Sequence, residues 1–99
     1  MNVTIQSVHF DATAQLQEFI TKKVSKLGKF SDSIVDAEVI LKVVKPETAN
    51  NKETSIKLNI KNGDLFANKV ADTFEEATAL CVEALEKQVL KIKEKQQAK

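Results

Sequence analysis

The stretch TSIKLNIKNGDLFANKVA, residues 54–71, decides the fold of this sequence. Ile56, Leu58 and Ile60 alternate with polar residues, which predicts a strand with one buried face and one wet face. Asn-Gly-Asp at 62–64 is a strong hairpin turn, and residues 65–71 predict the returning strand. The chain is therefore built around an antiparallel hairpin whose outer face is polar.

The segments outside this hairpin predict two further strands. Residues 2–8 alternate between apolar and polar side chains. Residues 35–45 are rich in β-branched residues and end before Pro46, which cannot continue a ladder. We expect the polar segment 46–54 to form a mobile hairpin loop.

Two segments change to helical periodicity. The first helix has one apolar face, made of Leu16, Phe19, Ile20, Val24 and Leu27. Thr13 or Asp11 is its expected N-cap, and Gly28 is expected to end it in a left-handed turn. The second helix is predicted from about Thr73 to the mid-nineties, with an inner face made of Phe74, Ala77, Cys81, Leu85, Gln88 and Ile92.

The order β-α-β-β-β-α predicts an α+β fold, with residues 1–99 as a single domain and 95–99 as a frayed tail. A right-handed crossover makes the first two strands parallel, and two hairpins return the chain, which gives a four-stranded mixed sheet. Each helix runs antiparallel to the strand before it. The two helices are therefore expected to be roughly parallel, on one face of the sheet, with their C-terminal halves at the same end.

Composition excludes several classes of protein. With 42% hydrophobic and 29% charged residues, the 99-residue chain reads as an ordinary globular domain. No apolar run approaches the roughly 20 residues that span a bilayer. The N-terminus lacks the layout of a secretory signal, and a single cysteine cannot form an internal disulfide, so a cytoplasmic location is expected.

Charge is distributed unevenly along the helices. Residues 72–86 carry five acids and no base, whereas residues 22–29 carry four lysines and residues 87–99 carry five. Nine of the fifteen lysines are thus expected at one edge, although the net charge is only +1. This pattern fits solvated helix ends that favour the macrodipole, by about 0.3–1 kcal/mol per charge, or a patch that faces a polyanion.

The candidate RNA-binding residues are the lysines of these two segments: Lys22, Lys23, Lys26, Lys29, Lys87, Lys91, Lys93 and Lys95. Lysine suits phosphate, whereas bidentate reading of bases usually uses arginine, asparagine or glutamine. The sequence contains no arginine, tryptophan or tyrosine. The expected binding is therefore to backbone and shape, and it weakens with salt.

Signals for catalysis are weak. His9 follows a strand end and is read as a turn residue, and Cys81 is read as a small core residue. One histidine and one cysteine do not make a spaced zinc-ligand set, and two glycines exclude a P-loop or dinucleotide fingerprint. Glu75, Glu76, Glu83 and Glu86 are read as a solvated helix face. We expect no enzymatic activity, catalytic residue, metal or cofactor.

Four segments together resemble the ribosome hibernation-promoting factor family: QLQEFITKKVSKLGKF, VDAEVILKVVK, NGDLFA and TFEEA…EALEKQVLKIKEK. Members are also called ribosome-associated inhibitor A or protein Y, ribosomal subunit interface proteins and sigma-54 modulation proteins. The resemblance covers essentially the whole chain and implies a fold similar to a double-stranded-RNA-binding domain. Because the sequence stops at Lys99, it resembles the short form, without the further domain through which long forms pair two ribosomes.

The resemblance implies a stationary-phase or stress-response factor that occupies the tRNA and messenger channel of the small ribosomal subunit, contacts ribosomal RNA and inhibits translation. Lys23 and Lys26 match basic positions of the family's first helix. The basic end of its second helix is matched by Lys87, Lys91, Lys93 and Lys95. Lys22 and Lys29 are supported by position alone. The family's Ala-Ile-Asp run reads here as Ala77-Thr78-Ala79, so a role for that aspartate does not transfer.

The leading hypothesis is a non-enzymatic translation inhibitor that places its lysine edge against ribosomal RNA phosphates. The alternative is a sigma-54 modulation protein that acts on a transcription sigma factor through protein–protein contacts. A generic binder of double-stranded RNA is a third interpretation. Co-sedimentation with ribosomes separates the first two, and competition by duplex RNA separates the first from the third.

Overall fold

The computed structural model describes residues 2–8, 10–30, 33–44, 51–61 and 63–97, with side chains up to residue 92. Its elements follow in the order β1 (Asn2–Val8), α1 (Ala14–Ser25), the 3-10 turn η1 (Lys26–Lys29), β2 (Ile34–Val43), β3 (Lys52–Ile60), β4 (Gly63–Ala71) and α2 (Phe74–Gln97). Within the described residues, neither helix has an apolar stretch sufficient to cross a bilayer.

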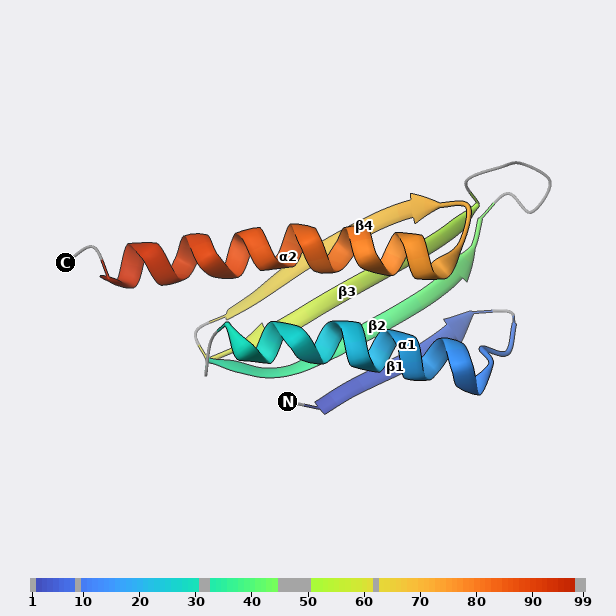
Figure 1. The fold of residues 1–99 in the computed structure, drawn as a ribbon, viewed down its shortest axis with the longest axis horizontal. Coiled ribbons are helices and arrows are strands. Elements are labelled where there is room, and N and C mark those ends of the chain that lie inside the picture. Colours follow the sequence, from blue (N-terminus) through green and yellow to red (C-terminus); the bar gives the residue numbers. More distant parts are fainter. Residues whose placement is uncertain (1, 9, 31–32, 45–50, 62, 98–99) are drawn as a thin grey trace.

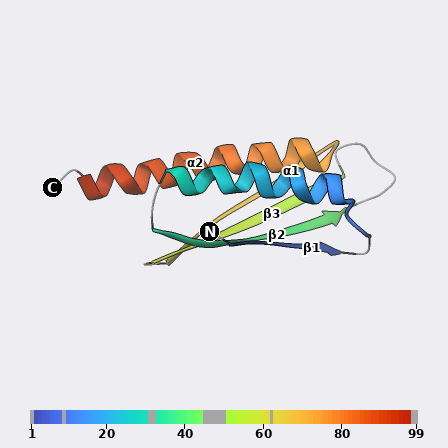
Figure 2. The same ribbon diagram turned by 60° about the horizontal axis from the view of Figure 1, so that its bottom comes forward.

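The four strands form one mixed sheet in the order β1-β2-β3-β4. β1 pairs with β2 in parallel, and the other two pairs are antiparallel. α1 and α2 run in the same direction (Figure 1) and cover the same face of the sheet (Figure 2). The predicted α+β fold, its strand pairing and its parallel helices are confirmed.

The hydrophobic core lies between the helices and the sheet. The alternation in β3 is confirmed, because Ile56 and Leu58 are fully buried. The inner face expected for α2 is wrong near its C-terminal end. Val89, only 4% exposed, enters the core in place of Gln88, and Ile92 is half-buried and lies outside the core cluster. Val89 lies one helical turn after Leu85, whereas the Gln88 amide donates to the Phe66 carbonyl oxygen at 3.2 Å.

Threonines cap both helices. The Thr13 hydroxyl accepts a hydrogen bond from the Leu16 amide at 3.1 Å, which confirms Thr13 as the N-cap of α1. The Thr73 hydroxyl accepts one from the Glu76 amide at 3.1 Å and caps α2 in the same way. These bonds satisfy amides that have no partner within the helix.

The end of α1 differs from the expectation. Gly28 does not end the helix in a left-handed turn, since Gly63 (φ +148°) is the one described glycine with positive φ. The chain instead continues into η1, where the Phe30 amide donates to the Leu27 carbonyl oxygen at 3.1 Å. This tighter turn keeps Leu27 fully buried, which accounts for the difference.

Two element boundaries also differ. β3 begins at Lys52, inside the segment 46–54 expected as a loop, because Lys52 pairs with Val43 across the hairpin. α2 reaches Gln97 and so includes part of the expected frayed tail 95–99, since no glycine or proline interrupts a lysine- and glutamine-rich end. His9, residues 45–50, Asn62 and residues 98–99 lie outside the described residues.

Candidate nucleic-acid interface

The eight predicted lysines lie on the two parallel helices and on η1. Lys22 and Lys23 are in the last turn of α1, and Lys26 and Lys29 are in η1. The others, Lys87, Lys91, Lys93 and Lys95, lie along the second half of α2. α2 projects past the end of α1 in the same direction (Figures 1 and 2). Both sets of lysines therefore belong to one end of the helical layer.

A groove of about 350 Å³ lies between the helices, and its charged lining residues include both lysines and glutamates. It is lined by Lys23, Lys26, Phe30, Ala79, Val82, Glu83 and Glu86. The acids of α2 were expected as a solvated face, and Glu75, Glu76 and Glu83 are exposed while Glu86 is half-buried. Glu83 and Glu86 share the lining of the groove with lysines of α1 and η1. Acidic and basic residues that are separated along the sequence are therefore partly neighbours in the structure. The C-terminal end of α1, with its lysines, lies beside the middle of the longer α2, with its glutamates.

The lysines of α1 lie on different sides of that helix. Lys23 is half-buried, and its Nζ lies 5.7 Å from the centroid of the Phe19 ring, which restrains the side chain. Lys22 is exposed and lines another shallow hollow, together with Glu18 and Phe19. The structure thus brings Lys23 and Lys26 together in the groove and leaves Lys22 on a different side of α1.

Lys87 and Lys91 are exposed on α2. Lys87 Nζ lies 3.7 Å from a Glu83 carboxylate oxygen, and the two side chains are 77% and 64% exposed. An ion pair this exposed contributes about 0–1 kcal/mol, so it leaves Lys87 available to phosphate. Both lysines can therefore take part in phosphate binding.

Lys69 is a candidate that the sequence analysis did not select. It is exposed on β4 and lines a second groove with Lys87. The alternation of residues 65–71 could have indicated that Lys69 points toward the helices, since it lies on the same strand face as the buried residues Ala67 and Ala71. That signal was overlooked because Lys69 is isolated in the sequence from the two lysine clusters.

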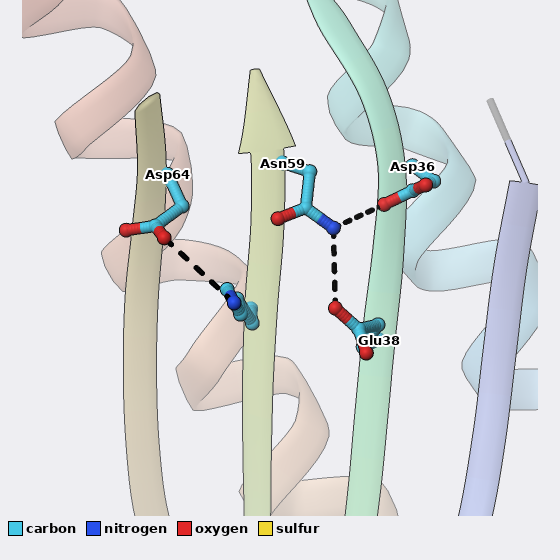
Figure 3. Close-up of polar contacts among 5 residues, drawn as sticks. Asp36, Glu38, Asn59 and Asp64 are labelled. Atoms are coloured by element: carbon cyan, nitrogen blue, oxygen red, sulfur yellow. Dashed lines mark hydrogen bonds and ion pairs between the residues drawn. The ribbon is translucent and has the colours of Figure 1, made fainter. Parts of the chain in front are cut away.

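The opposite face of the sheet is charge-compensated (Figure 3). The Asn59 side-chain amide donates to the carboxylates of Asp36 and Glu38, the latter at 3.1 Å. Lys57 Nζ lies 3.8 Å from an Asp64 carboxylate oxygen. This face places carboxylates around its central lysine and offers little attraction to phosphate.

Cys81 is a buried core residue, as predicted. It is 0% exposed, and its Sγ–H donates to the Thr54 carbonyl oxygen at 3.1 Å. Burial raises the pKa of the Cys81 thiol to about 11, against smaller opposing effects of a Lys69 backbone hydrogen bond and the Lys69 charge. The thiol is therefore neutral near pH 7 and unsuited to nucleophilic attack.

The raised pKa of Cys81 predicts a loss of stability in alkaline solution. Above pH 9.0, the ordinary value, the unfolded thiol ionises while the folded thiol stays neutral until about pH 11. The neutral thiol thus stabilises the fold below pH 9, and by pH 10 the free energy of unfolding should fall by about 1 kcal/mol from this group. Urea unfolding of the wild type and Cys81→Ala between pH 8 and 10.5 measures it; equal pH dependence in both proteins would contradict it.

Comparison with known proteins decides the family. The family model described as sigma 54 modulation protein / S30EA ribosomal protein matches residues 3–97. The chain belongs to this family. The resemblance of the sequence to ribosome hibernation-promoting factors is thereby confirmed.

Individual relatives of the sigma 54 modulation / S30EA family agree with this assignment. The chain is 29% identical over 98 residues to the ribosome hibernation promoting factor of Pseudomonas putida, covering 99% of this chain and 92% of that protein. It is 28% identical over 96 residues to the protein of the same name from Azotobacter vinelandii, covering 97% of this chain and 86% of that protein.

Two solved structures share the fold. The N-terminal domain of Thermus thermophilus protein Y superposes with a TM-score of 0.81 at 19% identity, covering 93% of this chain and 99% of that one. A ribosomal subunit interface protein from Coxiella burnetii gives a TM-score of 0.83 at 20% identity, covering 94% of this chain and 98% of that one. At these identities the likeness concerns the architecture of the sheet and helices.

Proposed function

We propose that this protein is a non-enzymatic, ribosome-binding inhibitor of translation that acts during ribosome hibernation. The observation that carries the proposal is the parallel arrangement of α1 and α2, which gathers lysines from separate parts of the sequence at one end of the helical layer (Figure 1). Membership of a family whose relatives are named ribosome hibernation promoting factors supports it.

In this mechanism the lysine end of the helical layer faces ribosomal RNA in the tRNA and messenger channel of the small subunit. Lysine ammonium groups contact backbone phosphates, and the body of the domain excludes tRNA and messenger by occupying their space. Binding depends on charge and shape because the chain has no arginine for bidentate contacts to bases. The charge-compensated sheet face points away from the RNA.

Binding to isolated small ribosomal subunits should therefore depend steeply on salt. The full chain is expected to co-sediment with the subunits at about 0.1 M KCl and to be released by about 0.5 M, because each neutralised phosphate contributes about 0.7–0.9 to the slope of log K against log salt. Gradient sedimentation at several salt concentrations, with binding measured by fluorescence of the labelled chain, determines this slope.

Other outcomes favour different functions. Binding that is unchanged at about 0.5 M salt would contradict contact through phosphates. Duplex RNA that competes as well as small subunits would indicate a general double-stranded-RNA binder. Absence of co-sedimentation, together with binding to a purified sigma-54 factor, would support action on transcription instead.

A further inference from the structure

α2 lies along the edge strand β4 (Figure 1). A second groove is lined by residues of both elements, on the face of α2 next to the one that lines the first groove. This groove has a volume of about 270 Å³ and is lined by Lys69, Leu80, Glu83, Ala84 and Lys87. Two lysines from different elements thus flank a short apolar wall. The resemblance implies RNA contact for Lys87, but no resemblance or comparison assigns a ligand to Lys69 or a role to Glu83.

The backbone of β4 directs Lys69 toward α2. Ala67 and Ala71, at alternate positions, are 6% and 3% exposed beneath the helical layer, and Lys69 lies between them on the same face. Lys69 shares the lining of the groove with Leu80 and Lys87 of α2. Lys69 remains exposed and can reach a ligand in the groove.

Glu83 is the acidic residue that the two grooves share. It lines the groove between the helices with Lys23 and Lys26, and the groove beside β4 with Lys69 and Lys87. Its carboxylate lies 3.7 Å from Lys87 Nζ, and both side chains are largely exposed. Glu83 is thus the carboxylate that pairs with Lys87 beside the groove, and such an exposed ion pair is weak enough to be displaced by an incoming anion.

We propose that the groove between β4 and α2 is a further binding site for an RNA backbone phosphate, held by Lys69 and Lys87, and that Glu83 competes with this phosphate. The inference rests on the proposed function. The phosphate sits between the two ammonium groups, and Leu80, 39% exposed, packs against the adjoining ribose. Glu83 lowers the affinity for RNA by pairing with Lys87 whenever the phosphate is absent.

The test measures the affinity of the labelled full chain for isolated small ribosomal subunits between 50 and 200 mM KCl. Lys69→Gln should weaken binding by about 5- to 10-fold and lower the salt slope by about 0.7–0.9. Glu83→Gln should tighten binding by about 3- to 5-fold, because it frees Lys87. In a Lys69→Gln/Lys87→Gln background, Glu83→Gln should change the affinity by less than about 1.5-fold.

Matched controls on other surfaces carry the same changes of charge. Lys42→Gln, on the open face of the sheet, and Glu76→Gln, in the first turn of α2, should each shift the affinity by less than about 2-fold. A gain of affinity in Glu83→Gln cannot arise from misfolding, so the proposal is tested even if Lys69→Gln is unstable.

The outcomes separate this proposal from the function on which it rests. Wild-type binding together with equal effects of Lys69→Gln and Lys42→Gln would overturn the site and leave ribosome binding intact. An unchanged or weakened affinity of Glu83→Gln would overturn its role as competitor. Absence of wild-type binding would overturn both the site and the proposed function.

Discussion

Reversing two charges on α2 should abolish most ribosome binding. In Lys87→Glu/Lys91→Glu, two exposed ammonium groups in the second half of α2 become carboxylates. Two phosphate contacts are lost and replaced by repulsion, so the affinity for small subunits at 0.1 M KCl should fall by about 100-fold or more, with a salt slope smaller by about two. Sedimentation and fluorescence titration measure both quantities.

The matched control for this experiment is Lys42→Glu/Lys57→Glu on the opposite face of the sheet. It changes the net charge equally and removes one exposed ion pair, that of Lys57 with Asp64. Its affinity should stay within about 3-fold of the wild type, because screening limits the influence of charges more than a Debye length of about 10 Å from the RNA. Equal losses in the two double variants would show that net charge, rather than the end of α2, controls binding.

Shortening one leucine of α2 should destabilise the fold strongly. Leu85 is fully buried between α2 and the sheet. Leu85→Ala removes apolar contact and leaves a cavity, so the free energy of unfolding should fall by about 2–5 kcal/mol. A loss near 3 kcal/mol lowers the Tm of a domain of this size by more than about 10 °C. Urea denaturation followed by circular dichroism measures the difference.

Leu90→Ala provides the control on the same helix. Leu90 is 38% exposed, so the same truncation should reduce the free energy of unfolding by less than about 1 kcal/mol. Comparable losses in the two variants would contradict the burial of the α2 face that contains Leu85. Because Leu85 is far inside the core, its loss should also weaken ribosome binding only through the fraction of unfolded protein.

Much of the fold was predictable from local sequence patterns. The alternation of Ile56 and Leu58 identified the inner face of β3. Thr13 was one of two residues expected to cap α1, and α2 was expected to begin at about Thr73, which caps it. The predicted core face of α2 was wrong where two neighbouring positions could each have faced the sheet. Gln88 and Val89 both lie near the apolar stripe of α2, and only packing against the sheet selects Val89 for the core.

The lysine clusters were visible in the sequence, but their surroundings were not. Pairing among charged side chains depends on the offset between α1 and α2, which lie side by side although their residues are far apart in the chain. The same offset sets Glu83 and Glu86 beside Lys23 and Lys26. Lys69 was missed for a related reason, since only the position of α2 along β4 brings it to Lys87.

The amino-acid sequence alone determined the order of the elements, the inward faces of the strands and the presence of two basic helix ends. These properties follow from the periods of helix and strand and from local capping, which act over a few residues. Tertiary structure decided which charges are neighbours and where grooves form. Those features depend on how side chains of distant elements pack together, and no local pattern in the chain specifies that packing.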